Sequence, residues 1–125
     1  MTSVYRKVRV KAGPGGWGGP LVLEPDERRN KVMSVTGGGI HPVAQRIAEL
    51  TGAQAIDGFF KPAPDAEVLC VVIDCGGTAR VGVYPMKRIP TIDIYPASPS
   101  GPLASFIKED VFVSGVRLDD IEVVA

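Results

Sequence analysis

The sequence has no long hydrophobic run, no excess of charge of either sign, and few histidines and cysteines. No apolar stretch approaches the roughly 18 residues of a membrane-spanning helix, and no signal peptide opens the chain, so we expect a cytoplasmic protein. Fourteen Lys and Arg balance 14 Asp and Glu, which argues against a nucleic-acid partner. The two cysteines and one histidine fit no zinc pattern and no disulfide framework, so we expect neither a metal nor a cofactor.

What the chain does contain is enough apolar sequence for a core, divided by many turns. Its 125 residues are 45% hydrophobic, which suits one soluble domain over residues 1–125. The 15 glycines and 11 prolines gather between short periodic segments, at residues 13–20, 37–39, 62–64 and 96–102.

Alternating and continuous apolar segments predict seven or eight short strands and two helices. The predicted strands are 4–11, 21–23, 31–35, 67–73, 79–84, 91–95, 111–116 and 121–124, with a short strand or turn at 54–60. Residues 42–50 have helical spacing and stop before Gly52, and residues 102–107 predict a second helix. Because strands and helices do not alternate regularly, we expect an α+β fold with a mixed or mostly antiparallel sheet rather than a doubly wound one.

The most informative segment is residues 73–80, Ile-Asp-Cys-Gly-Gly-Thr-Ala-Arg. It predicts that a buried strand delivers Cys75 to a glycine turn before the next strand begins. Backbone N–H groups in the turn, together with Arg80, lower the pKa of a thiol and can hold an oxyanion attached to its sulfur. Asp74 acts in the opposite direction, because a neighbouring carboxylate raises the pKa of a thiol.

A structural role for the cysteines is the simpler interpretation from composition alone. Cysteine is among the most buried residue types, and Gly-Gly is a common hairpin turn. Cys70 shows this pattern clearly, because it lies within the predicted strand between Leu69 and Val71 and has no basic neighbour. We therefore expect Cys70 in the core and leave both interpretations open for Cys75.

Two other glycine-rich segments contain notable side chains. Trp17 is a single large aromatic residue among five glycines, and it either plugs the edge of the core or helps to form a docking wall. His41 follows a Gly-Gly-Gly turn at the start of the predicted helix, where a capping role is commoner than a catalytic one. A glycine turn before a helix can bind anions, although this one matches no nucleotide-binding pattern.

Five segments together resemble the enzyme IIB domain of the glucitol (sorbitol) branch of the bacterial phosphoenolpyruvate-dependent sugar phosphotransferase system. The resemblance covers almost the whole chain, and the cysteine segment is its most specific part. The segments are Gly-Gly-Trp-Gly-Gly-Pro at 15–20, Thr-Gly-Ala-Gln-Ala-Ile-Asp-Gly at 51–58, Val-Ile-Asp-Cys-Gly-Gly-Thr at 72–78, Arg-Ile-Pro-Thr-Ile at 88–92 and Ser-Gly-Pro-Leu-Ala at 100–104.

The resemblance implies a phosphoryl carrier. Such a domain accepts phosphate from a phosphohistidine of enzyme IIA, holds it on a cysteine, here Cys75, and passes it to incoming sorbitol. On this basis we expect the backbone of Gly76, Gly77 and Thr78 to hold the phosphate oxygens, together with the Thr78 hydroxyl and Arg80. Lys87 and Arg88 are alternative phosphate ligands. With Trp17 they also form a candidate docking rim.

The family resemblance also implies a membrane partner. Its IIB portion is usually followed by membrane-spanning sequence, so we expect this chain at the inner face of the membrane, through a membrane-embedded enzyme IIC component or a continuation of the chain.

Two other functions remain. One is a ligand- or protein-binding module with a packed Cys75, and the other is a cysteine phosphatase, whose loop is generally longer.

Overall fold

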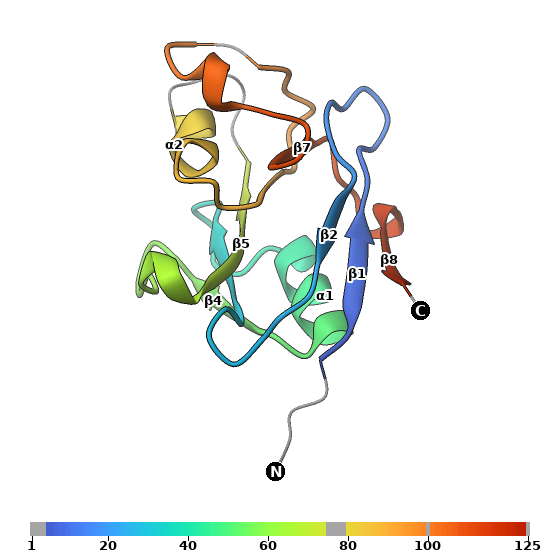
Figure 1. Cartoon of the computed structure of the whole chain (residues 1–125), viewed down its shortest axis with the longest axis vertical. Helices are drawn as coiled ribbons and strands as arrows, with labels where there is room; N and C mark the ends of the chain where they lie inside the picture. Colours follow the sequence, from blue (N-terminus) through green and yellow to red (C-terminus); the bar gives the residue numbers. More distant parts are fainter. Residues whose placement is uncertain (1–4, 75–79, 100, 125) are drawn as a thin grey trace.

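The computed structural model describes residues 5–74, 80–99 and 101–124, and these form two β-sheets with helices against them (Figure 1). The three-stranded sheet contains β1 (Lys7–Val10), β2 (Leu21–Leu23) and β8 (Ile121–Val124). The five-stranded sheet contains β3 (Lys31–Val35), β4 (Gln54–Asp57), β5 (Val68–Ile73), β6 (Thr91–Asp93) and β7 (Phe112–Ser114). The helices are α1 (Pro42–Thr51) and α2 (Arg80–Met86), with 3-10 turns η1 (Asp65–Glu67), η2 (Ala104–Phe106) and η3 (Leu118–Asp120).

The larger sheet is parallel throughout. Its strand order is β4-β3-β5-β6-β7, and every neighbouring pair runs in the same direction. The expected α+β class is consistent with this arrangement, but the prediction of a mostly antiparallel sheet is wrong, because only the three-stranded sheet is antiparallel. All six residues of β5 are buried, which is typical of a parallel strand that is covered on both faces.

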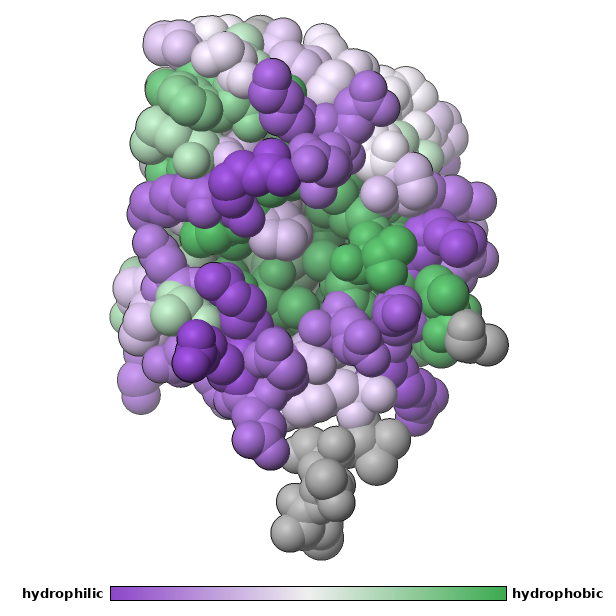
Figure 2. Space-filling view, viewed as in Figure 1, coloured by the Kyte–Doolittle hydropathy of each residue, from purple (hydrophilic) through white to green (hydrophobic). Residues whose placement is uncertain are grey.

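The two faces of the parallel sheet bury different partners. One face packs against α1 and the antiparallel sheet, so that both sheets share one hydrophobic cluster that includes Val10, Val32, Ile47 and Ile92. Figure 1 draws α1 between β5 and the β1–β2 pair, as this packing requires. The other face forms a second cluster, which includes Ile73 and Phe112 and extends to Tyr84 of α2. Figure 2 shows that this face of the molecule is mixed, with hydrophilic residues around a hydrophobic area that is exposed near its middle.

The segment predicted as a strand at 79–84 is helical over its described residues. Val81, Val83 and Tyr84 favour a strand by propensity, but α2 occupies Arg80–Met86. The connection between the parallel strands β5 and β6 must cross over the sheet, and α2 supplies that crossover. Gly82 allows close packing, because a Cβ there would overlap the side chain of Leu103. The expectation that a hairpin strand follows the Cys75 segment is therefore wrong.

Of the two predicted helices, one is confirmed and the other is wrong. α1 follows the predicted range closely: Pro42 lies in its first turn, and Gly52 ends it in a left-handed conformation with a φ of 86°. Residues 102–107, by contrast, contain only the three-residue turn η2. The strands predicted at 21–23, 31–35 and 121–124 match β2, β3 and β8 residue for residue.

Candidate functional site

The carboxyl ends of the parallel strands lie together along one edge of the sheet. At this edge the connections between strands change direction. From β3 the chain crosses to β4 on one side, whereas from β5 it crosses to β6 on the other. In open parallel sheets, ligands bind outside the carboxyl ends of the strands at such a switch point. Residues 36–39 leave β3 there and residues 74–79 leave β5, so the predicted cysteine segment begins at the switch point.

The last residue of β5 is fixed by its pairing with both neighbouring strands. Ile73 is paired with Val35 on one side and Asp93 on the other, and the Ile94 N–H donates to the Ile73 carbonyl at 2.8 Å. Asp74, the next residue, is exposed. The predicted carrier Cys75 and the predicted phosphate ligands Gly76, Gly77 and Thr78 lie outside the described residues. Arg80 is the first residue of α2, and its side chain is also outside the description.

The turn after β3 is anchored by a serine within the sheet. Ser34 is fully buried, and its hydroxyl donates to the Gly39 carbonyl at 3.2 Å and accepts from the His41 N–H at 3.0 Å. Gly37 and Gly39 both have positive φ, which glycine adopts without strain. This network places the glycine turn and the start of α1 beside the end of β5.

His41 is the N-cap of α1. Its Nδ1 accepts a hydrogen bond from the Val43 N–H at 3.0 Å and so satisfies one of the backbone donors that a helix start leaves open. The prediction of a capping histidine is therefore confirmed.

Trp17 packs against the core beside β7. Its ring centroid lies 6.2 Å from that of Phe112, and its backbone exchanges hydrogen bonds with Ser114, whose N–H donates to the Trp17 carbonyl at 2.9 Å. Gly18 continues this contact as an antiparallel bridge to Val113. The glycine-rich loop thus covers the outer edge of β7, and the half-buried indole contributes to the second cluster. A docking role for Trp17 stays a prediction.

Cys70 lies in the centre of β5, as the sequence predicted. It is fully buried in the cluster that includes α1, and burial raises the pKa of its thiol to about 12. A thiol in this environment is a poor nucleophile, because the thiolate is the reactive form.

Lys87 and Arg88 lie at the opposite edge of the parallel sheet from the exit of β5. They follow α2 and precede β6, where the strands begin. Arg88 forms a two-pronged ion pair with Asp110, with distances of 2.7 and 3.2 Å, and the hydrogen bonds from its guanidinium lower the pKa of that carboxyl. Lys87 lies 3.3 Å from Asp65. Lys87 and Arg88 therefore lie away from the exit of β5 and are paired with acidic residues.

Two buried polar residues at the strand ends were not singled out from the sequence. Ser34 and Asp93 are both fully buried, in β3 and β6 respectively. The signal that could have identified them is a polar residue near the carboxyl end of a short predicted strand. Asp93 accepts a hydrogen bond from the Tyr95 N–H at 3.0 Å.

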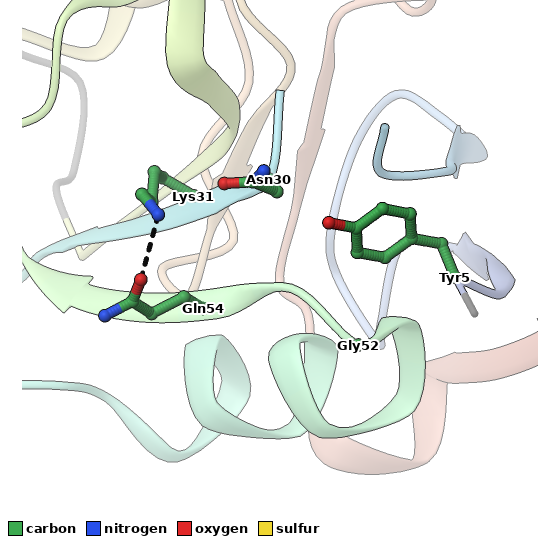
Figure 3. A pocket seen from close by; sticks show the side chains of 5 residues that line it. All are labelled: Tyr5, Asn30, Lys31, Gly52 and Gln54. Carbon is green, nitrogen blue, oxygen red and sulfur yellow. Dashed lines mark hydrogen bonds between the residues drawn. The ribbon is translucent and has the colours of Figure 1, made fainter. Parts of the chain in front are cut away.

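A hollow of about 230 Å³ opens at the other edge of the sheet, where β3 and β4 begin and α1 ends (Figure 3). Within it the Lys31 ammonium donates to the side-chain oxygen of Gln54 at 2.9 Å. A neighbouring hollow of about 240 Å³ shares these two residues. Neither hollow is lined by a cysteine, serine or histidine.

Residues 5–74, 80–99 and 101–124 contain no group of three or more acidic, histidine and cysteine side chains placed to hold a metal ion. Within the same ranges, no helix has the length and apolar character needed to cross a bilayer.

Comparison with known proteins identifies relatives along almost the whole chain. The sequence model of the family described as "Sorbitol phosphotransferase enzyme II N-terminus" matches residues 7–125. The glucitol/sorbitol-specific EIIB component of the PTS system of Clostridium beijerinckii is 47% identical over 118 residues, which cover 94% of this chain and 35% of that protein. The chain thus spans about a third of that relative's length. No solved structure matches the chain.

Proposed function

Since this chain belongs to the family of sorbitol phosphotransferase enzyme II N-terminal regions, we propose that it is the enzyme IIB phosphoryl carrier of a glucitol/sorbitol-specific phosphotransferase system, with Cys75 as the carrier. Residues 1–125 form this carrier domain. It receives a phosphoryl group from a phosphohistidine of enzyme IIA and passes it to sorbitol, which enters through the membrane-embedded enzyme IIC component. The domain works at the cytoplasmic face of the membrane.

One observation about the fold supports this function most directly. The segment with Cys75 joins the carboxyl end of β5 to the start of α2 at the switch point of the parallel sheet. Ligands of open parallel sheets bind outside the carboxyl ends of the strands at such a point, whereas Cys70 is buried within β5. Of the two thiols, only Cys75 therefore belongs to a segment at an edge suited to group transfer.

The first transfer exchanges one bond to phosphorus for another. The Cys75 thiolate attacks the phosphorus, the S–P bond forms, and the N–P bond to the donor imidazole breaks. The imidazole leaves as a neutral group, with the proton released by the thiol balancing the charge. In the second transfer a hydroxyl of the sugar attacks, the S–P bond breaks, and the hydroxyl proton leaves as the thiolate is restored.

Both transfers require stabilisation of charge on the non-bridging oxygens. The backbone N–H groups of Gly76, Gly77 and Thr78 supply donors for this purpose, and the Thr78 hydroxyl adds another. Arg80, at the start of α2, adds a charge-assisted pair. The donor imidazole and the sulfur must lie in line with the phosphorus, so enzyme IIA docks over the carboxyl edge of the sheet.

The proposal is tested with the two cysteine variants. Purified wild type, Cys75→Ser and Cys70→Ser are incubated with phosphorylated enzyme IIA, and the phosphate on each chain is measured. Wild type and folded Cys70→Ser should become labelled, and Cys75→Ser should not. Labelling of Cys75→Ser at the wild-type level would refute the assignment of the carrier.

A further inference from the structure

β4 is an edge strand of the parallel sheet. Among the described residues it pairs only with β3, whereas the outer side of β7, at the opposite edge, is covered by the glycine-rich loop through the bridge between Gly18 and Val113. β4 contains no proline, no lysine and no bulge, which are features with which proteins commonly protect such an edge from pairing. It is therefore open to pairing with another strand.

The hydrogen bonds between β4 and β3 show which backbone groups of β4 point outward. The N–H groups of Gln54 and Gly58 donate to carbonyls in or next to β3, at 2.9 and 2.8 Å. Because alternate residues of such a strand bond to opposite neighbours, Ala55 and Asp57 direct their N–H and carbonyl groups away from β3. The Asp57 carbonyl accepts hydrogen bonds from the turn that follows, which leaves its N–H and both groups of Ala55 for a further strand.

Apolar side chains at this edge are incompletely buried. Ala55 packs against the first hydrophobic cluster and Ile56 against the second, and both are partly exposed. Phe60, in the turn that follows β4, is 90% exposed, more than any other large hydrophobic side chain in the described part of the chain. A partner on the outer side of β4 would extend both clusters.

We propose that β4 pairs antiparallel with β4 of a second copy of this chain, about a two-fold axis at Ile56. In this register Asp57 of each copy lies opposite Ala55 of the other, so that the Asp57 N–H donates to the Ala55 carbonyl. An axis at Asp57 would instead set two like charges directly opposite each other, which is destabilising. The two Ile56 side chains meet on one face of the joined sheets and connect the second clusters of the two copies.

The same register brings Phe60 to the hollows at the amino end of the strand. Because the strands are antiparallel, Gly58 lies opposite Gln54 of the second copy, and the turn with Phe60 lies just beyond it. Gln54 lines both hollows (Figure 3), and the hollow of about 240 Å³ is also lined by Ile56 and Ala63. An exposed aromatic ring and a hollow at opposite ends of one strand form a self-complementary surface, as a two-fold interface requires.

The size of the contact predicts a weak dimer. Two copies of Phe60 bury about 300–500 Å², at about 150–250 Å² for each phenylalanine. The two four-residue strand edges add little to this, so the total lies below about 1,200 Å², in the range of transient interfaces. We therefore expect a dimer that forms at high protein concentration and dissociates on dilution.

Disulfide trapping tests the register. Ile56→Cys in a Cys75→Ser background, whose remaining Cys70 is buried, places two thiols across the axis. Directly opposite Cα atoms at such a position lie about 4.5 Å apart, within reach of a disulfide. Gln54→Cys is the matched control, because its two Cα atoms are offset by about 13 Å along the strands. Under mild oxidation we expect the Ile56→Cys dimer to form at least about tenfold faster than the Gln54→Cys dimer.

Sedimentation equilibrium measures the strength of the dimer without an added thiol. Phe60→Ser should weaken it by about tenfold or more, since each copy loses a buried ring. Phe106→Ser is the control, because Phe106 is an exposed side chain of η2, which packs against α2. The Cα atoms of the two Asp57 residues lie about 8 Å apart in this register, so Asp57→Asn should strengthen the dimer about threefold or more at low salt. High salt should remove that difference.

Equal cross-linking of the two cysteine variants, or no cross-linking of folded Ile56→Cys, would overturn the pairing of β4. A wild-type protein that stays monomeric at about 1 mM would do the same, as would a dimer that Phe60→Ser leaves unchanged. Where Ile56→Cys does not fold, the sedimentation of Phe60→Ser and Asp57→Asn decides the question. These measurements involve no phosphate, and the interface contains no residue of the cysteine segment, so the pairing and the carrier function can fail separately.

Discussion

Two cysteines five positions apart illustrate how far single residues can be understood from this sequence. Cys70 was correctly predicted in the core, because it lies within a continuous apolar strand. Ser34 and Asp93 were missed, because a polar residue in a short strand looks like an exposed position until the parallel sheet buries both faces. Whether such a residue faces a site depends on its strand neighbours, which are distant in the sequence.

The burial of Cys70 predicts a pH effect on stability. Burial raises the pKa of this thiol in the folded protein to about 12 from its ordinary value of 9.0, so the thiol ionises first in the unfolded chain. This contribution to stability is complete below about pH 9 and is lost as the pH rises toward 12, by up to about 1.4 kcal/mol per unit. Urea unfolding between pH 8 and about 11 should show a steeper loss in wild type than in Cys70→Ala.

Lysine and tyrosine residues also titrate in this range, and the Cys70→Ala variant corrects for them because it retains them all. Parallel stability curves for the two proteins would contradict the assignment. In native protein near neutral pH, a thiol reagent should leave Cys70 unmodified until denaturant is added.

At the scale of elements, local pattern identified most strands and α1 but misassigned α2. The segment around Val81–Tyr84 has β-branched and aromatic residues, and its place as the crossover between parallel strands overrides that preference. The parallel order itself could not be predicted from the sequence, because pairing joins residues far apart, such as Ile73 and Asp93. The glycine-rich turns were easier to interpret, since several of their glycines have a positive φ, which other residues rarely adopt.

The loop around Trp17 should depend strongly on Gly18. Its φ is 83°, and a Cβ there would collide with the Phe112 carbonyl oxygen. We expect Gly18→Ala to lower the free energy of unfolding by about 1–3 kcal/mol or more. Gly38 is a suitable control, because a Cβ there meets nothing within 4 Å, and Gly38→Ala should change stability by no more than about 0.5 kcal/mol. Equal denaturation midpoints for the two variants would contradict the described packing of this loop against β7.

At the scale of the whole molecule, the parallel sheet separates the basic residues that the sequence grouped together. Arg80 begins α2 at the edge where the strands end, whereas Lys87 and Arg88 lie where the strands begin. Sequence spacing alone allows each of the three basic residues to reach the phosphate, because it predicts a strand at 79–84, where the structure has α2. The family could be recognised from local motifs, but the polarity of the sheet could not.

This separation predicts different effects for the arginines. Loss of one oxyanion ligand commonly slows a transfer about 10²- to 10³-fold, and we expect this for Arg80→Ala with the fold retained. Arg88→Ala breaks an exposed ion pair with Asp110, which contributes little to stability, and should transfer phosphate at about the wild-type rate. Rapid-quench measurement of phosphate acceptance from enzyme IIA distinguishes the two. A slow Arg88→Ala beside a normal Arg80→Ala would move the anion site to the other edge.

The most direct measurement is the intact mass of the protein after incubation with phosphoenolpyruvate and the upstream phosphotransfer proteins. A relay through one sulfur predicts a gain of a single phosphoryl group in wild type, localised to the peptide with Cys75, and no gain in Cys75→Ser. An unchanged wild-type mass, or a phosphoryl group on any other residue, would contradict it.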